Sequence, residues 1–549
     1  MKPVVLIVLD GWGLAPPGQG NAISLAKLET MPFLWHTYPH TELAASGEAV
    51  GLPYDEDGNT ETGHINIGAG RTVYQDLPRI SMAVKDGSFF TNDTFLAAIA
   101  HARTHGSNIH LLGVVSDAGV HASREHLYAL LELIKKQGMT DNVYIHVFTD
   151  GRDATPTSGE RFVRELEERL ASLKVGKIAT VMGRYFAMDR DHRWDRTEKA
   201  YRCITQADGG SLATSAREVI RASYASRITD EFIEPTIITD ATGAAMPRIQ
   251  DNDSVIFFNF RIDRPRQLTR ALVLSNFETA KQTEAFDPYA VKYYHRHVVT
   301  QEGGQPFVRK VILENLFFVS MTQYEPNLSV SVAFPPQKVF APIGSVLSEH
   351  KIRQLRVAET EKERFVTYYF NGMREEPYPQ EDRLIIPSPG VPTYDLKPEM
   401  AALELTEQVL HRIVIGVYGF ILINFANPDM VGHTGNIPAA VKACELTDSS
   451  VGSIVKAVLA QGGTCIITGD HGNVEEMLGA DGKMDTEHST FPVPLIMVNT
   501  NFQGYPHVLP KGKLGDIAPT ILAHMGLTVP PEMTGKNLMA DLPAGRQVL

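Results

Sequence analysis

Short apolar runs that end in polar loops and are followed by amphipathic segments recur along this chain of 549 residues. Val4–Leu9 is an uninterrupted apolar run directly before Asp10, and Val143–Phe148 ends in the loop DGRD. The segment that begins near Ser123 repeats leucines at the spacing of one helix face. Buried strands that alternate with amphipathic helices predict an α/β fold in which most strands are parallel.

The chain is longer than one hydrophobic core usually serves, so we expect two domains. Its content of 43% hydrophobic and 21% charged residues is ordinary for a globular protein. The segments Tyr74–Arg79 and Gln301–Phe317 are candidate connections between the domains. With these connections the first domain is built from both ends of the chain, and the second is inserted between them.

Composition also excludes several classes of partner. The formal net charge of −13 argues against a nucleic acid or an anionic membrane surface. No apolar run reaches the roughly 18 residues that a membrane-spanning helix needs. The start of the chain lacks a small-residue cleavage site and reads as a first strand rather than a signal peptide. Cys203, Cys444 and Cys465 form neither metal-ligand spacing nor a disulfide framework, which suits a reducing cytoplasm.

Polar clusters follow the predicted strands at their carboxyl ends, where open α/β sheets place their ligand sites. Turns and helix caps also require Asp, Gly and Asn in such loops, and this explanation competes for any single loop. Many loops in this chain carry metal-ligating or phosphate-binding residue types. Taken together, they favour a functional site over ordinary turn chemistry.

Carboxylates and imidazoles that could bind divalent metals occur in four of these segments. Alone, each has an ordinary alternative, since an Asp after a strand often caps a helix and a loop His is often solvated. Together they supply enough ligands for two ions, an arrangement that clamps an in-line phosphoryl transfer. The candidate ligands are Asp10, Asp429 and His433 (four residues apart), the adjacent Asp470 and His471, and His488.

The segment GNTETGHINIGAGR (58–71) is typical of a loop that enters a helix, with Thr60 at or near its first turn. One interpretation is that the Thr60 hydroxyl is an N-cap. The other is that a metal ion lowers the pKa of this hydroxyl, which then attacks phosphorus. A phosphorylated Thr60 would lie at the positive end of the helix dipole, a favourable place for an anion.

Arginines gather in three short motifs that follow predicted strands, DGRD, GRYFAMDRD and NFRIDR, near a histidine in SDAGVHAS. Arginine grips planar carboxylate and phosphate oxygens with two bonds, so we predict an anion pocket rather than scattered surface charge. Asp153 is the candidate general acid or base there. Lys362 either pairs with a neighbouring glutamate or offsets the charge of a transferring phosphoryl group. The cationic residues of the predicted pocket are Arg152, Arg184, Arg190, Arg261, Arg264 and His121.

From Val4 to about Gly535 the chain resembles the cofactor-independent phosphoglycerate mutases of the alkaline phosphatase superfamily. The resemblance rests on ordered motifs that include LDGWG, GHINIGAGR, SDAGVHAS, DGRD, GRYFAMDRD, FFNFRIDR, AETEK, PSPGVPTYDLKPEM, NFANPDMVGHTG and GDHGN. It implies an alkaline-phosphatase-like α/β/α sandwich, here residues 1–74 and 315–540, that carries the metals. It also implies an inserted substrate-binding phosphotransferase domain, residues 75–314, and leaves 541–549 as a tail.

The same resemblance implies the chemistry. It suggests interconversion of 2- and 3-phosphoglycerate in glycolysis and gluconeogenesis through a phosphothreonine at Thr60, by a monomer in the cytoplasm. Two Mn²⁺ ions, or other divalent metals, would serve as cofactors, and 2,3-bisphosphoglycerate would not be needed. Asp429, His433 and His488 would hold one ion, and Asp10, Thr60, Asp470 and His471 the other. His121, Arg152, Asp153, Arg184, Arg190, Arg261, Arg264 and Lys362 would contact the substrate.

Two departures from the family pattern keep rival functions open. The family usually has Ser where this chain has Thr60 and Val where it has Thr62, and the extra methyl of Thr60 is stiff and crowds the site. A metal-dependent phosphatase or phosphopentomutase could use the same metal ligands, although the arginine motifs suit a small substrate that carries both carboxylate and phosphate. A non-catalytic phosphoester-binding relative is disfavoured because all seven metal-type positions are present.

Overall fold

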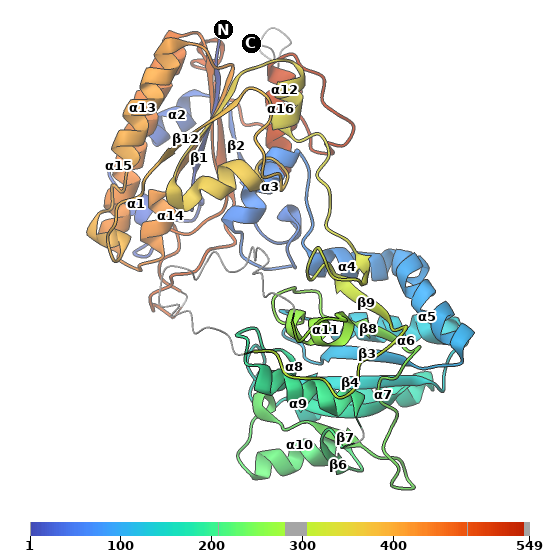
Figure 1. The fold of residues 1–549 in the computed structure, drawn as a ribbon. Coiled ribbons are helices and arrows are strands. Elements are labelled where there is room, and N and C mark those ends of the chain that lie inside the picture. The colour runs from blue at the N-terminus through green and yellow to red at the C-terminus, as the bar shows by residue number, and fades with distance from the viewer. Residues whose placement is uncertain (1, 207, 280–304, 480, 543–549) are drawn as a thin grey trace. The chain divides into compact units, whose positions relative to one another are not determined.

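A computed structural model describes residues 2–206, 208–279, 305–479 and 481–542. The chain divides into two compact units, Met1–Gln75 with Gln337–Leu549, and Asp76–Pro336. Within the described residues, each unit is built on an eight-stranded sheet with helices packed against it (Figure 1). The predicted α/β class is confirmed.

The sheet of the first unit joins the two ends of the chain. Its central strand β1 is parallel to both β13 and β14, with Val4 opposite Phe420 on one side and Thr464 on the other. All six residues of β1 are buried, as the apolar run predicted. The strand order is β12 (Glu381–Ile386), β11 (Gln354–Glu359), β13 (Phe420–Phe425), β1 (Val4–Leu9), β14 (Thr464–Gly469), β15 (Val493–Val498), β2 (His40–Ala44) and β16 (Gly512–Lys513).

Helices cover both faces of this sheet, with α13 and α15 on one face and α3, α12 and α16 on the other (Figure 1). The longest, α15, starts where the Asn436 side chain accepts the amide of Ala439, with Pro438 in the first turn. The helices of this unit are α1 (Ala22–Leu25), α2 (Thr30–Thr37), α3 (Thr60–Ala69), α12 (Ile343–Glu349), α13 (Ala402–Ile415), α14 (Asn427–Gly432), α15 (Ile437–Ala460) and α16 (Ile517–His524).

The second unit has its own sheet and its own hydrophobic core. Its strand order is β10 (Ser331–Phe334), β9 (Phe317–Thr322), β8 (Ser254–Phe257), β3 (Ile109–Val114), β4 (Val143–Thr149), β5 (Lys177–Gly183), β7 (Thr236–Ile238) and β6 (Ser211–Ala213), with only β7 antiparallel to its neighbour β5. Its helices are α4 (Asp76–Asp86), α5 (Asp93–His105), α6 (Arg124–Lys136), α7 (Gly159–Leu173), α8 (Arg184–Ala187), α9 (Trp194–Thr205), α10 (Ala216–Ala225) and α11 (Arg266–Val273). Helix α6 is the helix predicted from about Ser123, and its apolar face is buried.

The second boundary of the insertion differs from the expected one. Residues 315–336 were assigned to the metal-carrying domain, but they belong to the inserted unit. The reason is that β9 pairs with β8 and β10 pairs with β9, so the chain leaves this sheet only after Phe334. Of the predicted connection Gln301–Phe317, residues 301–304 lie outside the described residues, as do residues 543–549 of the predicted tail.

Within the described residues, none of the helices combines the length and the apolar character that crossing a bilayer requires. Cys203, Cys444 and Cys465 are buried and unpaired. The sequence-based expectation of no disulfide framework agrees with this finding.

Candidate functional site

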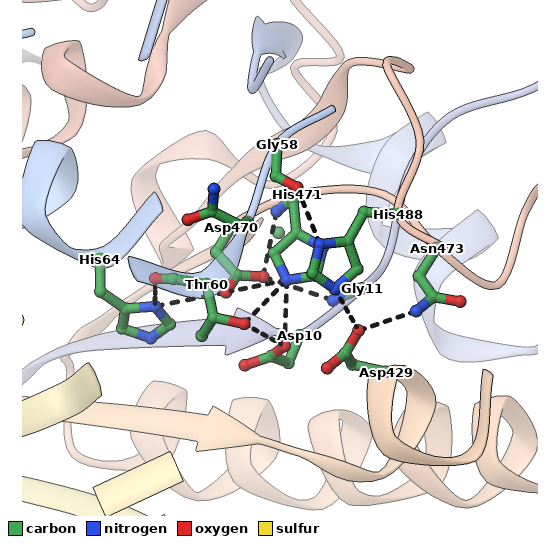
Figure 2. Close-up of polar contacts among 12 residues, drawn as sticks. Asp10, Gly11, Gly58, Thr60, His64, Asp429, Asp470, His471, Asn473 and His488 are labelled. Carbon is green, nitrogen blue, oxygen red and sulfur yellow. Dashed lines mark hydrogen bonds and ion pairs between the residues drawn. The ribbon is translucent and has the colours of Figure 1, made fainter. Parts of the chain in front are cut away.

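The register of the central strands of the first unit gathers the predicted metal ligands. Leu9, the last residue of β1, is opposite Phe425 of β13 and Gly469 of β14, so these three parallel strands end side by side. The loops that follow therefore share one edge of the sheet (Figure 2). Three sets of candidate ligands lie there, and within each set the ligand atoms are within 4.8 Å of one another: Asp429, His433 and His488; Asp10, Asp429 and His471; and Asp10, His64 and Asp470.

The first set presents three acceptor atoms to one point. The Nε2 atoms of His433 and His488 lie 3.3 and 3.4 Å from Asp429 Oδ1. The Nδ1 atom of His433 bonds the carbonyl of Thr486 at 2.7 Å, and that of His488 bonds the carbonyl of Gly58 at 2.9 Å. Because Nδ1 carries the proton in each ring, the Nε2 lone pairs face the carboxylate. This donor set fits a divalent cation.

The carboxylates and the imidazole of Asp10, Asp470 and His471 form a similar group of candidate ligands. His471 donates Nδ1–H to the carbonyl of Gly472 at 3.1 Å, and its Nε2 lies 3.4 Å from Asp10 Oδ1. Asp470 Oδ1 accepts the amides of Gly11 and His471, whereas its buried Oδ2 accepts no hydrogen bond among the described residues. A buried carboxylate oxygen without a donor is costly unless a cation is bound beside it. These residues also fit a metal ion.

Thr60 is the first residue of helix α3, and its hydroxyl faces this cluster. The N-cap of α3 is Asn59, whose side chain accepts the amide of Thr62 at 2.9 Å, so the capping interpretation of Thr60 is wrong. The Thr60 hydroxyl instead donates to Asp10 Oδ1 at 3.4 Å and lies 2.9 Å from His471 Nε2. The hydroxyl is thus placed among the candidate metal ligands.

Lys362 is buried at the end of a 3₁₀ helix, Thr360–Lys362, that follows β11. Its ammonium group donates to Asp10 Oδ1 and Asp429 Oδ2, each at 2.7 Å, and to Thr60 Oγ1 at 3.0 Å. Burial alone would lower the pKa of Lys362, but the carboxylates around it, first Asp10 and then Asp429, raise the pKa above its ordinary value. The lysine is therefore charged and joins the cluster, instead of pairing with its glutamate neighbours.

Glu475 ties the ligand-bearing loops together, and sequence reasoning missed it. Its Oε2 accepts the amides of Gly13 and Asn473, both at 2.9 Å, and its Oε1 accepts the hydroxyl of Ser489. A Cβ on Gly13 would lie 2.3 Å from Glu475 Oε1, so a larger residue there would displace the Glu475 carboxylate. Asn473 in turn donates to Asp429 Oδ1 at 2.9 Å. Gly13 and Asn473 lie in motifs of the sequence analysis, LDGWG and GDHGN, whereas Glu475 itself lies in none of them.

In the second unit, Arg184 starts helix α8 directly after β5 and is buried. Its Nη1 donates to Asp150 Oδ1 at 2.7 Å and to Asp153 Oδ2, and its Nη2 lies 2.9 Å from His121 Nε2. The hydrogen bond from His121 and the charge of Arg184 hold the pKa of Asp153 well below its usual range, despite burial. Asp153 is therefore an ionised carboxylate set between a histidine and an arginine.

Asp263 holds two further arginines of the predicted pocket. It accepts from Arg190 Nη1 at 2.8 Å and from Arg261 Nε at 3.1 Å. Burial would raise the pKa of Asp263, but Arg261 and its other cationic neighbours hold it below the usual value. Arg264 donates to the carbonyl of Met188 at 3.3 Å, and burial together with Arg190 lowers its pKa to about 10. Burial among cationic neighbours makes Arg264 well suited to bind an anion.

Arg152 differs from the other four arginines. Its side chain is 55% exposed, and its Nη1 lies 3.5 Å from Glu231 Oε1. Side-chain hydrogen bonds and ion pairs gather Arg184, Arg190 and Arg261 with His121 and Asp153. Arg152 instead joins this cluster through its backbone amide, which donates to Asp150 Oδ1 at 3.2 Å. Sequence reasoning missed Asp150 and Asp263, the carboxylates that pair with these arginines. Their positions inside the arginine motifs DGRD and FFNFRIDR were a signal that could have identified them.

Three comparisons with known proteins all find phosphoglycerate mutases. Residues 80–326 match a family model described as the N-terminus of BPG-independent PGAM. The chain is 49% identical over 548 residues to a 2,3-bisphosphoglycerate-independent phosphoglycerate mutase of Chloroflexus aggregans, covering 98% of each chain. It is 48% identical over 538 residues to the one of Moorella thermoacetica, again with 98% of each covered. A Leishmania mexicana phosphoglycerate mutase, solved at low cobalt concentration, is similar with a TM-score of 0.57 and 28% identity over 97% of both chains.

Proposed function

This chain belongs to the family of 2,3-bisphosphoglycerate-independent phosphoglycerate mutases, and on that premise we propose that it interconverts 2- and 3-phosphoglycerate through a phosphothreonine at Thr60. The observation that best supports this proposal is the position of the Thr60 hydroxyl, which lies 2.9 Å from His471 Nε2 and 3.0 Å from the Lys362 ammonium group. A hydroxyl held among candidate metal ligands and beside a fixed positive charge is suited to attack phosphorus, because a bound metal ion and that charge both favour its ionised form.

The proposed cofactors are two Mn²⁺ ions, one held by Asp429, His433 and His488 and the other by Asp10, Thr60, Asp470 and His471. Mixed carboxylate and imidazole ligands suit Mn²⁺, and the same donors accept Zn²⁺ or Fe²⁺. When bound, the ions would lower the pKa of the Thr60 hydroxyl and offset phosphate charge. The Nε2 lone pairs that converge on Asp429 support this assignment.

In the first half-reaction Thr60 Oγ1 forms a bond to phosphorus as the bond between phosphorus and the substrate oxygen breaks. The released glycerate hydroxyl gains the proton that Thr60 loses. In the second half-reaction the other hydroxyl of glycerate attacks phosphothreonine, and the proton returns to Thr60 Oγ1. Lys362, charged and within hydrogen-bond distance of Thr60, stabilises negative charge on the transferring group in both halves.

The arginine-rich cluster of the second unit is the proposed binding site for phosphoglycerate, whose carboxylate and phosphate match bidentate arginine donors. Arg184, Arg190, Arg261, Arg264, Arg152 and His121 are its proposed contacts. Asp153, ionised and next to His121, is the proposed acid and base for the glycerate hydroxyls. The enzyme is further proposed to act as a monomer in the cytoplasm, and its buried free cysteines suit that reducing compartment.

An assay that couples 2-phosphoglycerate formation to its dehydration, with Mn²⁺ and without 2,3-bisphosphoglycerate, tests the function. We expect 3-phosphoglycerate to be converted under these conditions. A metal-dependent phosphatase would instead release inorganic phosphate from 3-phosphoglycerate without forming 2-phosphoglycerate. A phosphopentomutase would act on pentose phosphates and leave 3-phosphoglycerate unchanged.

A further inference from the structure

His64 lies one helical turn after Thr60 in α3 and is fully buried beside the metal-type carboxylates (Figure 2). Its Nδ1 is 3.0 Å from the carbonyl oxygen of Thr60 and 3.3 Å from Asp470 Oδ2. Its Nε2 is 3.2 Å from Nδ2 of Asn424 in strand β13. Together with Asp10 and Asp470, His64 is close enough to hold a metal ion. Distance alone therefore allows two roles for His64: it could bind the metal ion itself, or it could position the residues that do.

The hydrogen bonds around His64 distinguish these roles. Asn424 Nδ2 lies 2.6 Å from Asp10 Oδ2, so the amide must turn its N–H groups toward that carboxylate. The other N–H of the same nitrogen faces His64 Nε2, which therefore accepts. Nδ1 then carries the ring proton and donates it to the Thr60 carbonyl. Neither ring nitrogen of His64 keeps a lone pair for a metal.

We propose that His64 is a positioning residue of the metal centre and not a ligand. Through Asn424 it fixes Asp10, and through the Thr60 carbonyl it fixes the first turn of α3, which carries the nucleophile. Asp470 Oδ2 lies 3.3 Å from His64 Nδ1 but has no hydrogen-bond partner among the described residues, so it stays available to the ion. This inference rests on the proposed function, in which Asp10, Thr60 and Asp470 bind one ion.

Two substitutions interrupt this chain of hydrogen bonds at different points. His64→Asn keeps a donor near the Nδ1 position for the Thr60 carbonyl but cannot reach Asn424. Asn424→Leu removes the donors to both Asp10 and His64 at similar volume. The matched control is His524→Asn, because His524 is also a buried helical histidine of this unit, bonded to Thr464 Oγ1 at 2.9 Å. Thr464 begins β14, at the opposite end of the strand from Asp470.

The measurement is the dissociation constant of Mn²⁺, from the loss of free Mn²⁺ signal in electron paramagnetic resonance titrations of the full chain. We expect His64→Asn and Asn424→Leu each to raise it about 10- to 100-fold, the range seen when supports of metal ligands are removed. The number of bound ions stays at the wild-type value, and kcat recovers at high Mn²⁺. KM for 3-phosphoglycerate is unchanged. The double variant is no weaker than either single variant, because both act through one chain of bonds.

Two results would overturn the proposal. Loss of one bound ion from His64→Asn would make His64 a ligand. The other result is that His64→Asn leaves the Mn²⁺ dissociation constant unchanged and only lowers the unfolding temperature in chelator, as His524→Asn does. His64 would then contribute to packing alone. These outcomes are distinct from failure of the proposed function, because a wild-type chain that binds Mn²⁺ but forms no 2-phosphoglycerate leaves the comparison of Mn²⁺ affinities intact.

Discussion

The Nε2 atoms of His433 and His488 lie 3.1 Å apart. Since each ring donates its Nδ1 proton to a backbone carbonyl, the two Nε2 lone pairs face each other next to the Asp429 carboxylate. Acceptors so arranged repel one another unless a proton or a cation lies between them. This pair of histidines therefore favours a bound divalent cation, and we expect the stability of the first unit to depend on that cation.

Metal binding should therefore stabilise the first unit specifically. With free Mn²⁺ at about 100 times its dissociation constant, we expect about 2.7 kcal/mol of added stability per site. Differential scanning calorimetry with and without chelator measures it. The unfolding transition of the inserted unit should stay in place, because its histidines and arginines form no comparable ligand set among the described residues. A shift of that transition alone would contradict the assignment of the metal centre.

Substitutions of Thr60 test the nucleophile. Thr60→Ser should keep activity because the hydroxyl remains, whereas Thr60→Ala should lower kcat more than about a thousandfold. Mass spectrometry after acid quench should find phosphate on the peptide that contains Thr60. Thr62→Ala is the control, since the Thr62 hydroxyl bonds only Asn59 within the described structure. An active Thr60→Ala enzyme would refute the role of the threonine.

Lys362 should stabilise the metal-free protein more than the metal-bound one. Replacing it by Met leaves the buried carboxylates of Asp10 and Asp429 without their ammonium partner, which costs about 3–5 kcal/mol. Bound Mn²⁺ would supply the missing positive charge, so the difference should shrink in its presence. Urea unfolding in chelator and in Mn²⁺ measures both values. Lys456→Met, at an exposed position of α15, should have little effect in either condition.

Asp153 and Asp150 should separate catalysis from binding. Asp153→Asn removes the proposed acid and base and should lower kcat about 10²- to 10⁴-fold. Asp150→Asn weakens the support of Arg184 and of the amides of Arg152 and Asp153, and it should raise KM for phosphoglycerate about tenfold or more. Initial rates over a range of substrate concentrations give both constants. If both variants changed KM alone, Asp153 would be a binding residue.

Glu359 should make stability fall with rising pH. Burial raises the pKa of its carboxyl to about 7, its Oε1 accepts the amide of Ala401, and its Oε2 has no partner within the described residues. A raised pKa means that the folded state favours the protonated form, so the penalty is absent below the unfolded pKa near 4.5 and complete above about 7.

Glu359→Gln keeps the acceptor for Ala401 and removes the buried charge. We expect it to stabilise the protein by about 2–3 kcal/mol at pH 8 and hardly at all at pH 5. Urea unfolding at the two pH values provides the measurement. An equal gain at both would show that ionisation of Glu359 is not the cause.

The strand pattern was enough to predict which side chains converge. Apolar runs such as Val4–Leu9 locate the strand ends, and the parallel register then brings Asp10 beside Asp470 without further information. The same logic failed at residues 315–336. Pairing of Phe317 with Ser254 depends on a distant strand, and the local sequence carries no mark of that partner.

Support residues were beyond prediction for a different reason. The roles of His64, Asn424 and Glu475 depend on which atom of each side chain faces which neighbour, and residue type and spacing do not encode that. Thr60 shows the reverse case. Its two interpretations were chemically sound, and only the backbone position of Asn59 as the cap distinguished them.

The central position of β1 has a consequence for how the chain is assembled on the ribosome. This strand emerges first, yet both of its neighbours, β13 and β14, are translated only after the inserted unit is complete. The inserted unit, whose pairings all fall within its own segment, can fold while synthesis continues. Until β13 and β14 are synthesised, β1 lacks both of its partner strands, and Thr60 cannot yet meet Asp470 and His471, which follow β14.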